Sequence, residues 1–159
     1  MNFLEQLVAE WYSYHLGYFV RTNVKFGRRA RGGYIGEMDV VAYHPETEVF
    51  IHIETSTDSD SWSKRKQKFE RKFRDARAHY VETFPFKNGI IRPRQIAIVG
   101  ANRNRNPNHS FGDSIEIIHI PELINEITNI LKEKDPWRDA VPEGYPLLRA
   151  IQYSSFYSK

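Results

Sequence analysis

The sequence predicts an α/β domain with a mixed central sheet flanked by helices, on three observations. Its 159 residues, 40% of them hydrophobic and 14% aromatic, are enough to fill one buried core. An amphipathic helical pattern opens the chain and is followed by runs of strand composition. A second long helical pattern then separates these runs from two further apolar runs, and such alternation is typical of a sheet covered by helices.

The first half of the chain predicts one helix and three strands. Apolar and aromatic side chains recur at helical spacing over residues 3–16, and Gly17 follows as a helix end. Strands are expected over residues 18–26, 37–43 and 48–54. A glycine-rich basic turn separates the first two strands, and His-Pro-Glu-Thr makes a tight turn between the second and the third.

The second half predicts a long helix, two strands and two more helices. The long helix runs from about residue 61 to residue 83, and the strands span 95–100 and 115–120. Pro121 suits the first position of a helix that continues through Leu131. Residues 1–134 are expected to form the core domain, with 135–159 as a linker and C-terminal helix that either packs on it or makes a two-fold interface.

Composition excludes several classes of site. The chain has no cysteine, so disulfides, thiolate zinc sites and iron–sulfur clusters are absent, and a metal would need oxygen or imidazole ligands. A mean hydropathy of −0.60 and the lack of a long apolar run exclude a transmembrane helix. The first residues lack the basic region of a secretory signal, so we expect a cytoplasmic protein without a membrane partner.

Charge is distributed unevenly along the chain. Residues 37–60 hold seven carboxylates and no lysine or arginine, whereas residues 61–105 hold 13 basic and 3 acidic groups. Carboxylates enclosed by basic segments suit a cation site on a surface that attracts a polyanion.

Two of these carboxylates are expected to converge. Asp39 and Glu54 lie near opposite ends of the predicted hairpin, which brings the start of one strand beside the end of the next. Hard divalent cations prefer oxygen ligands, commonly one or two carboxylates completed by water and substrate phosphate. The pattern therefore predicts a Mg²⁺ or Mn²⁺ site for phosphodiester hydrolysis, with no small-molecule cofactor.

The stretches GEMDVVA at 36–42 and IETS at 53–56 resemble the PD-(D/E)XK nuclease superfamily. The opening FLEQLVAEWYSYHLGYFV is similar to the leading helix of Mrr-like restriction endonucleases and archaeal Holliday-junction resolvases. The resemblance covers residues 3 to about 120 and implies a restriction-endonuclease-like αβββαβ core. It also implies a metal-dependent DNA endonuclease with Asp39, Glu54 and a helix glutamate as metal ligands.

Helical periodicity leaves both Glu5 and Glu10 open as this glutamate. The F-x-E context aligns Glu5 with the family residue, and Glu10 is then expected to be solvated. His52, on the strand face of Glu54, is expected to be a packed histidine more than a contact to water or phosphate.

The chain departs from the family at the third motif position, where Ser56 stands in place of lysine. Lys66 falls on the otherwise apolar stripe of the long helix, so it is the candidate replacement that would face the sheet, with a lysine at the core edge as the alternative. The neighbouring basic residues of this helix are expected to face outward and contact DNA phosphates, together with two basic loops. These phosphate contacts are Arg28, Arg29, Arg31, Lys64, Arg65, Lys68, Lys72, Arg103 and Arg105.

Three alternatives remain open on sequence alone. The first is RNA as the substrate. For a DNA enzyme a homodimer is expected, because cutting both strands needs two sites. Arg74 to His79 resembles the R-x₄-H motif of HEPN ribonucleases, which are all-helical enzymes that work without metal. A catalytically inactive nucleic-acid-binding or assembly subunit on a nuclease fold is the third, and Ser56 is its best support.

Overall fold

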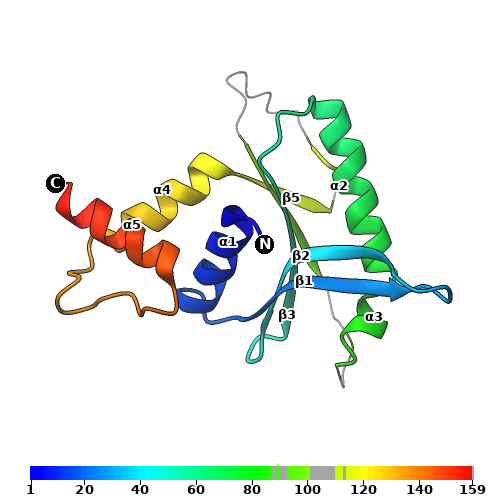
Figure 1. The fold of residues 1–159 in the computed structure, drawn as a ribbon, viewed down its shortest axis with the longest axis horizontal. Coiled ribbons are helices and arrows are strands. Elements are labelled where there is room, and N and C mark those ends of the chain that lie inside the picture. Colours follow the sequence, from blue (N-terminus) through cyan, green and yellow to red (C-terminus); the bar gives the residue numbers. More distant parts are fainter. Residues whose placement is uncertain (87–88, 90–92, 101–109, 113, 159) are drawn as a thin grey trace.

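The computed structural model describes residues 1–86, 89, 93–100, 110–112 and 114–158. Their centre is a five-stranded sheet with the spatial order β1-β2-β3-β4-β5 (Figure 1). The strands are β1 (Phe19–Arg28), β2 (Tyr34–His44), β3 (Val49–Ser56), β4 (Arg94–Val99) and β5 (Ile115–His119). The helices are α1 (Phe3–Tyr14), α2 (Trp62–Arg77), α3 (Tyr80–Thr83), α4 (Ile120–Leu131) and α5 (Pro146–Tyr157).

The sheet is mixed, as predicted. β1, β2 and β3 form an antiparallel meander, whereas β3 pairs parallel with β4 and β4 pairs parallel with β5. Parallel neighbours need a crossover, and α2 with α3 supplies it between β3 and β4. The α/β class and the order of elements are thus confirmed, and the sheet excludes the all-helical HEPN fold.

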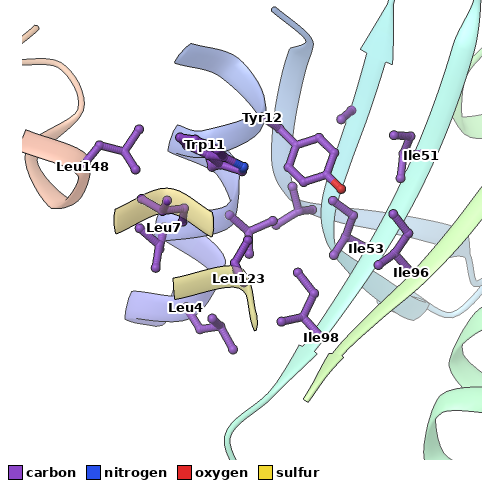
Figure 2. Close-up of a cluster of buried hydrophobic side chains, with 14 of the residues drawn as sticks. Leu4, Leu7, Trp11, Tyr12, Ile51, Ile53, Ile96, Ile98, Leu123 and Leu148 are labelled. Carbon is purple, nitrogen blue, oxygen red and sulfur yellow. The ribbon is translucent and has the colours of Figure 1, made fainter. Parts of the chain in front are cut away.

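One face of the sheet is covered by α1, α4 and α5 (Figure 1). Figure 2 shows the side chains of Ile51, Ile53, Ile96 and Ile98 directed from β3 and β4 toward α1. They pack against Leu4, Leu7, Trp11, Leu123 and Leu148, which come from these three helices. We call this the α1-side core.

The other face packs against α2 and α3. Phe50 contacts Tyr80 and Phe84 ring to ring, and Phe69 and Phe73 of α2 pack on Ala97 and Val99 of β4. We call this the α2-side core. The helix expected up to residue 83 ends earlier, at Arg77, and resumes as the short α3 after His79, whose φ of −117° is not helical.

The C-terminal helix α5 packs against α1 and α4, and Leu148 is part of the α1-side core. This segment was expected either to pack on the core domain or to make a two-fold interface. Its buried face packs on the core. Trp137 and Tyr157 remain exposed beside each other, with the indole N–H donating to the phenol at 2.7 Å. Within the described residues, no helix has the length and apolar character needed to cross a membrane.

Candidate active site on the α2 face of the sheet

The hairpin β2–β3 brings Asp39 and Glu54 together. Val40 pairs with Ile53, so the next position of the same register places Asp39 beside Glu54. Ile53 belongs to the α1-side core, and alternate residues of a strand point to opposite faces, so Glu54 faces α2. The backbone N–H of Thr55 donates to Asp39 Oδ2 at 2.8 Å, which ties the carboxylate of β2 to β3.

Asn23 on β1 lies opposite Asp39, because Thr22 pairs with Val40 and Val24 with Met38. Its φ of 52° is left-handed, a conformation that asparagine tolerates better than most residues. Val20 packs on the α1-side core whereas Val24 packs on the α2-side core, although both positions would share a face of a regular strand. The strand therefore turns over around Asn23, next to the carboxylate.

A lysine from α2 completes the acidic pair, and it is Lys72. Its Nζ lies 3.1 Å from Asp39 Oδ1 and also contacts Glu54 Oε2. The expectation that Lys66 would fill this place is wrong, since Lys66 is exposed and lies 3.8 Å from Glu70. Lys72 was expected to face outward, and this is wrong because its Nζ contacts both carboxylates.

Exposure increases across the site from Glu54 to Lys72. The Glu54 side chain is 1% exposed, Asp39 is 14% exposed and Lys72 is 28% exposed. Burial and the neighbouring charge of Glu54 raise the pKa of Asp39 above its usual value, against the opposing effect of Lys72. Burial also acts to raise the pKa of Glu54, but the His52 hydrogen bond and the Lys72 charge outweigh it and hold that pKa below its usual value.

For Lys72, burial and the neighbouring charges act on the pKa with signs opposite to those for a carboxyl group. Burial disfavours its ammonium, yet the two carboxylates overcome that effect and raise its pKa above the usual value. The site thus holds a persistent cation between two acidic oxygens.

His52 is buried, as expected for a packed histidine, but it is also bonded to the site. Its Nε2 lies 2.7 Å from Glu54 Oε1, and its Nδ1 lies 2.7 Å from the Tyr80 hydroxyl. The hydroxyl also accepts from Gln95 Nε2 at 2.9 Å. Sequence reasoning singled out neither Tyr80 nor Gln95, although a lone amide in the buried run QIAIV was an available signal.

Ser56 stands beyond Glu54 on the same strand and accepts from the backbone N–H of Asp58 at 3.3 Å. Asp58 in turn binds Lys68 at 2.8 Å and Arg65 at 3.3 Å. Burial opposes ionisation of Asp58, but the hydrogen bonds from Lys68, Ser56 and Arg65 outweigh it and lower its pKa far below the usual value. Ser56 thus contacts the turn after β3 and helps to fix its shape.

Arg65 was expected on the surface, and this is wrong because it is buried. Its guanidinium donates to the carbonyl oxygens of Asp58 and Gly100, so it ties the turn after β3 to the end of β4. A guanidinium has five donors and no acceptor, which suits it to collecting carbonyl oxygens.

The structure does not bring Glu5 to the acidic pair. Its carboxylate accepts from the backbone N–H and the side chain of Asn2, closing a capping box at the start of α1. Glu10 is buried, not solvated as expected, and accepts from the backbone N–H groups of Leu147 and Leu148. Among the described residues, no group of three or more His, Asp or Glu side chains is placed to hold a metal ion.

The remaining basic residues that the structure describes lie on α2 and at the β1–β2 turn. Lys64 and Lys68 precede Lys72 at intervals of four on α2, so they follow one stripe of this helix toward the acidic pair. Arg28, Arg29 and Arg31 are exposed at the β1–β2 turn. Arg103 and Arg105 lie outside the described residues.

Comparison with known proteins adds no relative. No protein-family model matches the sequence, and no curated protein matches it.

Proposed function

We propose that this chain is a metal-dependent nuclease that hydrolyses phosphodiester bonds, with DNA as its substrate. The observation that supports this most is the convergence of Asp39, Glu54 and Lys72 at the end of a basic stripe on α2. The resemblance predicted Asp39 and Glu54. The motif has a lysine where this chain has Ser56, and we propose that Lys72 on α2 takes the role of that lysine.

The donor set fits a hard divalent cation. Asp39 and Glu54 offer only oxygen atoms, and the Lys72 ammonium already lies against one oxygen of each. A bound Mg²⁺ or Mn²⁺ would supply a Lewis acid that draws negative charge from the phosphate.

The protein's own groups would hold and orient the reacting atoms. Hydrolysis joins a water oxygen to phosphorus and breaks a phosphorus–oxygen ester bond, and the departing oxygen takes up a proton. Lys72 would donate a charge-assisted hydrogen bond to a phosphate oxygen as negative charge builds on it. The Thr55 N–H holds Asp39 in place meanwhile.

Cleavage of supercoiled, single-stranded and branched DNA and of RNA with Mn²⁺ tests this proposal. Wild type should cut DNA and stop in EDTA, whereas Asp39→Asn and Glu54→Gln should lose at least about 10²-fold in rate but still bind DNA. Equal cutting by wild type and both variants would refute the site. Cutting of RNA alone would change the substrate, and binding without any cutting would favour an inactive subunit.

A further inference from the structure

Four polar side chains form a continuous hydrogen-bonded chain that ends at Glu54 of the acidic pair. Glu54 and His52 come from β3, Tyr80 from α3 and Gln95 from β4, and each is at most 3% exposed. Buried polar groups need partners inside the protein, because water does not reach them. The direction of every hydrogen bond in this chain can therefore be worked out from its ends.

The end at Gln95 is fixed by two neighbours of opposite kind. Arg77 is a donor only, and its Nη2 lies 2.5 Å from Gln95 Oε1. The backbone carbonyl of Phe73 is an acceptor only, and Gln95 Nε2 donates to it at 3.1 Å. The Gln95 amide thus has one orientation that satisfies both contacts, and in that orientation Nε2 also donates to the Tyr80 oxygen.

The proton positions further along the chain follow from this. Since the Tyr80 oxygen accepts from Gln95, its own O–H is left to donate to His52 Nδ1. Nδ1 is then an acceptor, so the single proton of a neutral imidazole sits on Nε2 and donates to Glu54 Oε1. The carboxylate, which can only accept when ionised, is the natural end of the chain.

We propose that His52 is a positioning residue, held by Tyr80 and Gln95 as the neutral Nε2–H tautomer, that occupies Glu54 Oε1 and leaves Oε2 to face a bound divalent cation. This rests on the proposed function, because the cation is the one that nuclease activity requires. Lys72 contacts that same Oε2, which marks the oxygen as the one directed to a cation.

A neutral donor is the group that this task requires. It removes one of two carboxylate orientations without cancelling the negative charge that attracts the metal. Partners that orient metal ligands from behind are commonly worth 10–100-fold in metal affinity or activity.

Nitrogen-15 NMR of the imidazoles in the full, metal-free chain tests the tautomer directly. His52 should show a protonated Nε2 and an unprotonated Nδ1. In Tyr80→Phe the Nδ1 resonance should shift toward that of an acceptor without a donor, whereas Tyr153→Phe, on an exposed helix α5 residue, should leave it unchanged. A proton on Nδ1 in the wild type, or no shift in Tyr80→Phe, would overturn the assignment.

Mn²⁺ binding measured by calorimetry tests the consequence. His52→Leu should weaken binding about 10–100-fold, and His52→Gln, which keeps an amide donor, should recover most of the loss. Binding that His52→Leu leaves unchanged would overturn the role of His52. If wild type binds no Mn²⁺ while the tautomer is as stated, the proposed metal site fails and the role of His52 toward a cation fails with it. If His52→Leu does not fold, the Tyr80→Phe spectrum decides.

Discussion

Lys72 on α2 reaches Asp39 on β2, with 3.1 Å between Nζ and Oδ1, although 33 positions separate them in the chain. The same ammonium contacts Glu54, so one side chain joins two strands and a helix at a single point. The contact places a positive charge beside both carboxylates.

This arrangement predicts different effects for two lysines of the same helix. Lys72→Met should lower the rate of DNA cleavage by about 10²–10³-fold, because a donor aimed at developing phosphate charge is lost. Lys66→Met, six residues earlier and exposed, should cut within a few-fold of wild type. Rates with saturating DNA measure both, and circular dichroism checks the fold. Wild-type rates from Lys72→Met would remove lysine from the site.

Arg65 and Lys64 are neighbours in sequence with different expected roles, one in stability and one at the surface. Arg65 is buried and bonded to two backbone carbonyls, whereas Lys64 is exposed. Arg65→Met should lower the free energy of unfolding by about 2 kcal/mol, because buried acceptors lose a charged donor. Lys64→Met should change it by less than about 0.5 kcal/mol.

Urea unfolding gives both values. Salt-dependent DNA binding of the folded Lys64→Met variant should show a shallower slope than wild type, since one phosphate contact is lost. An unfolding curve of Arg65→Met that superimposes on wild type would contradict the structural role.

The hairpin could be predicted from the sequence because strand periodicity is simple. Alternation by two residues put Asp39 and Glu54 on defined faces, and the turn between the strands fixed how they return. The helix was less certain for a geometric reason. At about 100° per residue, Arg65 and Lys66 lie on opposite flanks of the Phe69–Phe73 stripe, and the stripe cannot say which flank meets the sheet.

Tertiary structure decides that question. Lys72 follows Arg65 by seven residues, so both lie on the flank that faces β3, while Lys66 lies on the other. The hydrogen bonds that link Glu54 to Gln95 could not be predicted from the sequence either. Their residues come from β3, α3 and β4, and the sequence does not give the relative positions of these elements. Glu10 is a third case, since its partners lie on α5.

Glu10 predicts a measurable contribution to stability. Its carboxylate accepts at 3.0 Å from the N–H groups of both Leu147 and Leu148, at the start of α5, where Tyr145 offers no side-chain cap. Glu10→Ala should lower the free energy of unfolding by about 1–3 kcal/mol, because these N–H groups lose their acceptor and the positive end of the helix loses a negative charge.

Chemical unfolding of Glu10→Ala beside Glu133→Ala, which alters an exposed acid, measures the difference. The rate of DNA cleavage by folded Glu10→Ala should stay near wild type. A large loss of cleavage by a stable Glu10→Ala variant would reassign Glu10 to the active site.

Tyr12 is buried in the α1-side core. Burial, partly opposed by the charge of Arg94, raises the pKa of its phenol to about 12. An unfolded tyrosine has a pKa of about 10, so between about pH 10 and pH 12 the unfolded chain loses a proton that the folded chain keeps. Stability therefore falls as pH rises through this range, by up to about 2–3 kcal/mol from this residue.

Tyr12→Phe removes the phenol, so its unfolding free energy should decline less steeply over the same range. Parallel declines for wild type and Tyr12→Phe in urea titrations at stepped pH would show that the phenol is already ionised, or already hydrated, in the folded protein.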